Sequence, residues 1–403
     1  MKKLSIMLAV VAVWLLMTNY IATVAEQEIK ALFVESDHGE PLSIELQSYQ
    51  RHFFSSTAIT KLTVSDDETG DLSLIIISTI YHLPYQALIK NSIKLLDEAL
   101  NKKAESYFST TQWITSEERI NLFSELTGEL TIVAGSYKSD NESLSTKPVM
   151  VDYQVDLKTK KGYFNLNWAG LSATTNTTKV DLQALQLSSY ISLLTKQSDY
   201  NYRLKIAGIS IQQDKQKSLL EGVLLKGRSQ QGSKEETLDT SNELVIDSYQ
   251  FNTNSKQSFT DNRIKLALTG LYQPAFELLS SGSDDNQEIE NALTELVKHG
   301  AQLKLSQLSS KTPWGEVDGK LDLTLEQGAA LTDIAINPYI LFDYMSGDVS
   351  LVLPVNLLDE PTIAESLQMG LMTGFLEKNE QTLNLKTSFQ QGELTVNGRV
   401  IPL

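Results

Sequence analysis

The sequence of 403 residues contains no cysteine and only four histidines. The absence of cysteine excludes disulfide bonds, thiol nucleophiles, thiolate metal sites and iron–sulfur clusters. Basic charge is also scarce, because 34 lysine and arginine residues stand against 50 aspartate and glutamate residues and give a formal net charge of -16. A chain this acidic repels nucleic-acid phosphates at long range, so we expect no nucleic-acid partner.

No short catalytic motif is present. The chain lacks a Gly-x-Ser-x-Gly elbow, a His-Glu-x-x-His helix, a P-loop and a dinucleotide-binding glycine turn. The acidic turn Asp66-Asp-Glu-Thr-Gly-Asp71 lacks the ligand spacing of a calcium loop and is interpreted as a solvated turn. We therefore predict a non-enzymatic protein with no catalytic residue, no cofactor-binding residue and no metal site.

Three histidines deserve a specific interpretation. His38 lies between Asp37 and Glu40 and is interpreted as a solvated loop residue. His299 precedes Gly300 at the end of a predicted helix, where a cation is stabilised by the helix dipole. His82 has the strongest functional claim because an apolar strand ends there, although a structural role is the favoured interpretation.

One long hydrophobic run stands at the N-terminus. After Lys2 and Lys3, the stretch from Leu4 to Val24 carries no charge and is long enough for a helix to cross a hydrocarbon core of about 30 Å. The two lysines favour a cytoplasmic start, which places the body on the far side of the membrane. We predict a signal anchor over residues 1–25; a signal peptide cleaved at Thr23-Val24-Ala25 is the alternative.

From Leu42 onward, alternation of apolar and polar residues predicts strands. These lie at 42–46, 59–64, 72–81, 122–133, 149–157, 163–168, 202–211, 219–225, 244–251, 264–271, 301–308, 316–325, 348–353 and 382–389. The pair Asn397-Gly398 predicts a tight primed turn in a terminal β-hairpin. Helical spacing of apolar residues predicts helices at 86–108, 181–195, 274–279, 286–299, 338–345 and 361–372.

These elements predict a β-dominated α+β fold, with an extended curved antiparallel sheet, helices packed on one face and one N-terminal transmembrane helix. We place a β-rich region at 26–280 and an α+β region at 281–403, with one continuous domain as the alternative. The helices at 86–108, 181–195, 286–299 and 361–372 suffice to cover the apolar sheet face. Met369, Leu371, Met372 and Phe375 are interpreted as core.

Several segments carry a resemblance to a known family. They are Phe53-Phe-Ser-Ser-Thr-Ala58, Tyr81-His-Leu-Pro84, His299-Gly-Ala-Gln-Leu303, Thr312-Pro-Trp-Gly-Glu-Val-Asp-Gly-Lys-Leu321 and Gln391-Gly-Glu-Leu-Thr-Val-Asn-Gly-Arg-Val-Ile-Pro402. With the basic and then apolar N-terminus, they make the chain similar to the YdgA-like family of bacterial envelope proteins, which carry domain of unknown function 945. Leu83 stands where family members tend to carry glycine. The resemblance implies a membrane-anchored protein that faces the periplasm and supplies no catalytic residues.

The expected location is the bacterial inner membrane, with a single pass and the body in the periplasm. We expect a structural or protein-interaction module of the cell envelope; its partners are the inner membrane, a second copy of the chain or another envelope protein. The alternative is binding or transfer of lipid or another hydrophobic ligand. A third class, a hydrolase, would require His82 and nearby carboxylates to converge in a cleft. An open apolar groove favours lipid, and an exposed sheet edge favours protein partners.

Overall fold

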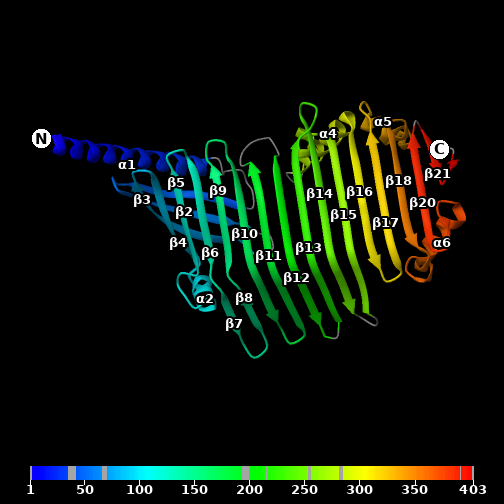
Figure 1. Ribbon diagram of the computed structural model, residues 1–403, viewed down its shortest axis with the longest axis horizontal. Coiled ribbons are helices and arrows are strands. Elements are labelled where there is room, and N and C mark those ends of the chain that lie inside the picture. Colours follow the sequence, from blue (N-terminus) through cyan, green and yellow to red (C-terminus); the bar gives the residue numbers. More distant parts are fainter. Residues whose placement is uncertain are drawn as a thin grey trace. The chain divides into compact units, whose positions relative to one another are not determined.

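The structure is a computed structural model that describes residues 2–34, 42–65, 70–192, 199–214, 216–252, 256–280, 285–390 and 392–401. Over these residues the protein is β-dominated, with antiparallel strand pairing and six α-helices (Figure 1). The chain divides into two compact units, Met1–Leu194 (unit 1) and Thr195–Leu403 (unit 2). The boundary near residue 280 stays a prediction, although strands on its two sides, Lys256–Tyr272 and Ala301–Thr312, pair with each other.

Unit 1 combines a long N-terminal helix with eleven strands. Its elements are α1 (Lys2–Val34), β1 (Leu42–Arg51), β2 (Ser55–Val64), β3 (Leu72–Leu83), β4 (Gln86–Leu95), α2 (Glu98–Phe108), β5 (Ile114–Asn121), β6 (Glu125–Ile132), β7 (Gly135–Lys138), β8 (Ser143–Thr146), β9 (Val149–Asp156), β10 (Lys161–Thr174) and β11 (Thr178–Ser192). Pairing follows the order β1-β2-β3-β4-β5-β6-β9-β10-β11. The β7–β8 hairpin pairs with the second half of β10 through β8.

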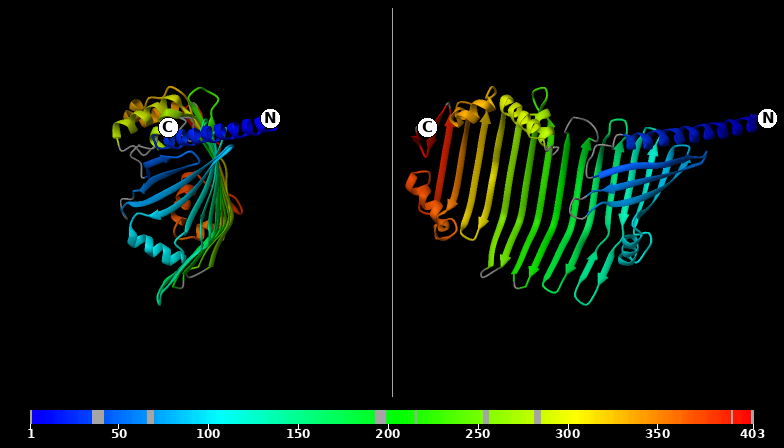
Figure 2. Two further views of the ribbon diagram at one scale, coloured as in Figure 1. Left: turned by 90° about the vertical axis from the view of Figure 1, so that its left-hand side faces the viewer. Right: turned by 180° about the vertical axis from the view of Figure 1, so that it is seen from behind.

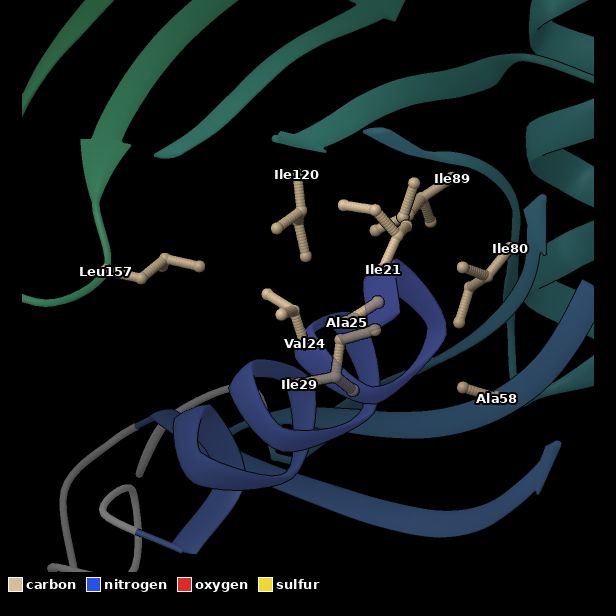
Figure 3. Close-up of a cluster of buried hydrophobic side chains, with 10 residues drawn as sticks. Ile21, Val24, Ala25, Ile29, Ala58, Ile80, Ile89, Ile120 and Leu157 are labelled. Carbon is tan, nitrogen blue, oxygen red and sulfur yellow. The ribbon is translucent and has the colours of Figure 1, made fainter. Parts of the chain in front are cut away.

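The core of unit 1 forms between the second half of α1 and the sheet. Ile21 and Ala25 are completely buried and, with Val24 and Ile29, project from one side of the helix (Figure 3). Sheet residues of the same cluster surround them, namely Ala58, Ile80, Ala87, Ile89, Ile120 and Leu157. Helix α1 is therefore a structural part of unit 1. No helix among the described residues combines the length and apolarity of a candidate membrane span.

Unit 2 is built on a second series of strands, of which the first four have 14 to 17 residues. Its elements are β12 (Tyr200–Gln213), β13 (Gln216–Gln231), β14 (Thr237–Asn252), β15 (Lys256–Tyr272), α3 (Gln273–Ser280), α4 (Asn286–His299), β16 (Ala301–Thr312), β17 (Gly315–Leu325), α5 (Leu331–Ile336), η1 (Pro338–Asp343), β18 (Met345–Pro354), η2 (Val355–Asp359), α6 (Ala364–Thr373), β19 (Glu377–Lys378), β20 (Thr382–Gln390), β21 (Glu393–Val396) and β22 (Arg399–Ile401). Consecutive strands from β12 to β18 pair as antiparallel neighbours, and β20 to β22 follow (Figure 1).

The predicted strands are confirmed, and so are most of the helices of unit 2. Helix α4 begins after Asp285, whose carboxylate accepts hydrogen bonds from the N–H groups of Gln287 and Glu288, and ends at His299 before Gly300. The helix expected at 338–345 is a 3-10 helix, η1. In the terminal hairpin, Asn397 and Gly398 have the positive φ angles expected of a primed turn, 47° and 79°.

The helix predicted at 86–108 is wrong over its first half. Residues Gln86–Leu95 form β4, and only Glu98–Phe108 is helical. The apolar residues of 86–95 fit the period of a helix and also the two-residue period of a strand. Ala87, Ile89 and Ile93 lie an even number of residues apart, as strand residues on one face do. Pairing with β3 across a short turn selects the strand.

The helix predicted at 181–195 is also wrong, because Thr178–Ser192 is strand β11. Ala184 has a φ of 29° and follows Gln183, which pairs with the distorted Gly170, whose φ is 129°. This distortion interrupts the alternation, so Leu182 and Leu185 are both half-buried while the residues between them are exposed. The three-residue spacing between Leu182 and Leu185 is also typical of a helix, and this explains the wrong prediction. Because residues 86–95 and 181–192 form strands, fewer helical residues are available to cover the sheet than the sequence predicts.

Candidate functional site

An unbroken row of apolar residues crosses the strands of unit 2. Each member lies directly opposite the next across β12 to β18 and β20: Leu204, Leu225, Leu244, Ile264, Leu308, Gly319, Leu351 and Leu385. Gly319 does not break the row. A Cβ at this position would lie 3.1 Å from Leu308 and 3.3 Å from Leu351, so these two side chains close over the glycine. At a strand spacing of about 4.8 Å, the row extends for about 34 Å.

A second row runs beside the first on the same side of the sheet. Its members, Leu266, Leu305, Leu321 and Val349, also lie opposite one another across neighbouring strands. Leu321 and Val349 are each two residues from a member of the first row, and residues two apart share one face of a strand. We call the two rows together the apolar face.

The side chains of the apolar face are only partly buried. Each is intermediate in exposure except Ile264, which is 39% exposed, and Gly319, which has no side chain and is buried. The buried apolar residues of unit 2 instead lie in or beside helices, or next to strand ends: Leu238, Leu271, Ala275, Ala292, Ala329, Leu357, Leu376, Leu383, Phe389 and Val396. The centre of the apolar face thus lacks the close packing of a core. A contiguous apolar surface that its neighbours cover only in part is a common feature of ligand and partner sites.

The opposite face of the same strands is charged. Glu243 lies between Lys226 and Lys265, at 3.3 and 3.5 Å, and Lys304 lies 3.1 Å from Asp322. Hydrogen bonds from Gln302 and Lys304 lower the pKa of Asp322. Such ion pairs are typical of a solvated surface. The sheet of unit 2 therefore has one water-compatible face and one apolar face.

A second feature is the junction between α1 and the end of β1. Arg51 donates from Nη1 to Glu26 Oε2 at 2.9 Å and from Nη2 to Asn19 Oδ1 at 2.9 Å and Thr23 Oγ1 at 3.1 Å. Lys30 Nζ donates to Glu26 Oε1 at 2.7 Å. These hydrogen bonds from Lys30 and Arg51 lower the pKa of Glu26. The helix is thus fixed to the sheet by charged contacts as well as by its buried side chains.

His82 is a buried structural residue. Its Nδ1 lies 3.0 Å from the Phe53 carbonyl oxygen, and its Nε2 lies 3.1 Å from Ser56 Oγ. Since a carbonyl only accepts, Nδ1 carries the proton and Nε2 accepts from the serine hydroxyl, which is the neutral tautomer. Burial lowers the pKa of His82. No carboxylate is hydrogen-bonded to the ring, so the convergence that a hydrolase requires does not occur at this residue.

The other candidates from the sequence have mixed outcomes. His38 and most of the acidic turn at 66–71 lie outside the described residues. His299 stands at the end of α4 as predicted, with Nδ1 2.8 Å from the Glu295 carbonyl oxygen and its ring stacked on Tyr272 at 3.9 Å. The interpretation of the methionine cluster as core is wrong. Met372 is 89% exposed and Met369 is 60% exposed, because both lie on the outer side of α6.

The described surface also has two polar depressions. One in unit 1, of about 350 Å³, is lined by Glu117, Arg119, Asp152 and Asn165 among others. Within it Arg119 donates to Glu117 at 2.6 Å and Asn165 donates to Asp152 at 2.7 Å. One in unit 2, of about 530 Å³, lies beside His299. Among the described residues, no group of three or more histidine, aspartate or glutamate side chains is placed to hold a metal ion.

Sequence reasoning missed both the length of the apolar row and the contacts of Arg51. The alternation in each strand was visible, but only the register shows that the apolar positions of eight strands align. Arg51 gives no local signal, because its partners lie about 30 residues earlier in the chain.

Fold and surface together define a class of β-dominated protein with antiparallel sheets and a half-exposed apolar face. A family profile described as "Bacterial protein of unknown function (DUF945)" matches residues 1–403. The chain belongs to this family, as its N-terminus, internal segments and terminal hairpin predicted. No curated protein and no solved structure matches the chain.

Proposed function

We propose that this protein is anchored in the bacterial inner membrane by the first half of α1, with its body in the periplasm, and that the apolar face of unit 2 binds lipid or another hydrophobic ligand. The location is supported by the basic start at Lys2 and Lys3 and by the uncharged run that follows. The ligand class is supported by the strand register of unit 2, which aligns apolar residues of eight strands into one row.

The apolar row is the observation that carries the ligand proposal. A soluble surface that exposes apolar side chains over about 34 Å is costly unless something covers it, since burial is worth about 25 cal/mol per Å². The row is long and contains no charged residue. It is also narrow, because each strand contributes only one or two residues to the apolar face. These dimensions suit an extended hydrocarbon chain.

The burial of α1 supports an anchor over a cleaved signal peptide. Cleavage after Ala25 would remove Ile21, Val24 and Ala25 from the core of unit 1. It would also remove Asn19 and Thr23, two of the groups that hold Arg51. The lost contacts would leave apolar sheet residues exposed to water.

Native mass spectrometry of the full-length protein tests the ligand proposal. The protein is extracted from membranes in mild detergent and compared with two variants, Leu244→Lys on the apolar face and Val245→Lys on the charged face of the same strand. We expect lipid at defined stoichiometry on the natural protein and on V245K, and at least a tenfold loss of that lipid on L244K. A lipid-free natural protein, or equal lipid on both variants, would contradict the proposal.

A structural or protein-interaction role is a second candidate, favoured by one observation. The outer side of α6 and the residue after its cap expose Met369, Met372 and Phe375, and exposed methionines suit adaptable protein contacts. The same native spectra bear on this candidate. A lipid-free dimer would favour self-association, whereas a lipid-loaded monomer would favour the ligand proposal.

A further inference from the structure

Aromatic side chains gather where α1 passes the turns of two hairpins in unit 1. Trp14 and Tyr20 lie on the helix, Phe53 and Phe54 form the turn between β1 and β2, and Tyr81 and Tyr85 flank the turn between β3 and β4. Phe54 lies 6.0 Å from Trp14 and 4.8 Å from Phe53, between ring centroids. We call these six residues the aromatic rim.

The aromatic rim is held together by the backbone of the two hairpins. The His82 N–H donates to the Phe54 carbonyl oxygen at 2.9 Å, and the buried His82 ring bonds the Phe53 carbonyl oxygen. Tyr81 pairs with Ser55 across β2 and β3. Both turns therefore lie next to each other, and the strands that carry them run alongside α1 (Figure 2).

All six side chains of the aromatic rim are exposed, between 43% and 60%. The helix surface beside them is apolar and exposed as well, at Val11, Val13 and Leu16. A water-facing turn rarely carries two adjacent phenylalanines, because each exposes a large apolar surface. Tryptophan and tyrosine are instead enriched where a protein crosses from lipid to water.

The charge of this region also differs from that of the rest of the chain. Residues 51–55 and 81–87 contain no aspartate or glutamate, although the chain as a whole carries a formal net charge of -16. Glu26 on α1, the carboxylate that Arg51 contacts, is paired with Arg51 and Lys30. The aromatic rim therefore meets a lipid surface without placing an unpaired carboxylate against it.

The length of α1 gives an independent reason for membrane contact. Thr18 and Ile21 are completely buried against unit 1, so the helix is mainly exposed only up to about Met17. From Leu4 to Met17 the helix rises about 21 Å, whereas a hydrocarbon core is about 30 Å thick. A span this short reaches across only if the adjoining part of the body enters the lipid interface or the bilayer thins.

We propose that the aromatic rim is a second membrane-contact surface, which rests in the interface of the bilayer that the first half of α1 crosses. The inference rests on the proposed anchor and adds to it the depth and orientation of unit 1. The occupant of the surface is the lipid bilayer itself. In this position unit 1 contacts the membrane surface directly and is not held away from it by the anchor alone.

The absence of cysteine permits a direct test by single-site labelling. Three full-length variants, Val11→Cys, His52→Cys and Asn176→Cys, are labelled with a fluorophore and reconstituted in phosphatidylcholine vesicles that contain brominated acyl chains. His52 adjoins the two phenylalanines, and Asn176 is an exposed residue of the turn between β10 and β11. We expect strong quenching at 11 and 52 and none at 176.

The outcomes separate the aromatic rim from the anchor. Quenching at 11 without quenching at 52 would overturn the aromatic rim and leave the anchor standing. Quenching at 52 without quenching at 11 would support membrane contact by the aromatic rim and overturn the anchor. Replacing Phe53, Phe54 and Tyr85 by serine should abolish quenching at 52, whereas replacing the exposed Phe123 and Tyr137 of unit 1 by serine should not.

Discussion

A buried neutral histidine in unit 1 links stability to pH. His82 is 2% exposed, and its two ring nitrogens are occupied by Ser56 and by the Phe53 carbonyl. Protonation would place a second proton on the ring, at Nε2, which now accepts from a hydroxyl, and would put a charge in the core. This explains why burial lowers the pKa of His82. The residue also holds the turn that carries two members of the aromatic rim.

Stability should therefore fall in mild acid. The unfolded chain takes up a proton at His82 near pH 6.5, while the folded chain does so only at lower pH, so the free energy of unfolding decreases as pH falls below about 6.5. Thermal unfolding between pH 8 and pH 5 measures this slope. His82→Asn should flatten it, whereas His52→Asn, at an exposed position, should leave it unchanged. An equal slope in all three proteins would contradict the prediction.

At the scale of the element, α1 has two halves with different surroundings. The first half exposes apolar side chains, including Leu16 at 69%, whereas Ile21, Val24, Ala25 and Ile29 of the second half are buried in unit 1. One continuous helix joins them, so no flexible linker separates the run that favours lipid from the part that packs on the sheet. The second half of the helix is therefore core, and the first half is the part that we propose as the anchor.

Truncation of one side chain in each half should distinguish the two roles. Ile21→Ala leaves a cavity in the core of unit 1 and should lower the free energy of unfolding by about 2–4 kcal/mol. Leu16→Ala removes a similar volume from an exposed position and should change it by less than about 0.5 kcal/mol. Denaturant unfolding in detergent measures both values. Equal effects would show that the second half of α1 is not part of the core.

At the scale of the whole molecule, the burial of α1 in unit 1 predicts which form of the protein folds. A chain that begins at Glu26 lacks Ile21, Val24 and Ala25 and should not fold correctly in unit 1, even though a sequence-based view treats Glu26 as the start of the body. The natural protein should keep all of α1 in the cell.

Intact mass of the purified protein tests this directly. We expect a mass of about 44.9 kDa, the mass of the uncleaved chain. A species shorter by the first 25 residues would instead show a cleaved signal peptide. It would also require the sheet residues Ala58, Ile80 and Ile120 to be covered by another element.

The sequence by itself determined that the protein is β-dominated, which family it belongs to and where most of its strands lie. Alternation of apolar and polar residues is a local property, and each strand shows it without reference to its neighbours. It failed at 86–95 and at 181–192, where local spacing fits a helix equally well and where pairing with β3 and with β10, respectively, selects a strand. Local patterns cannot resolve such cases, because the deciding contacts are distant in the chain.

Tertiary structure alone decided which apolar residues form a core and which form a surface. Leu244 and Ile21 are equally apolar in sequence, yet the first is half-buried in the apolar row and the second is completely buried beneath the sheet of unit 1. The same holds for Met372, expected in a core and found exposed. Burial depends on what lies opposite a side chain in space, and register across many strands places those neighbours.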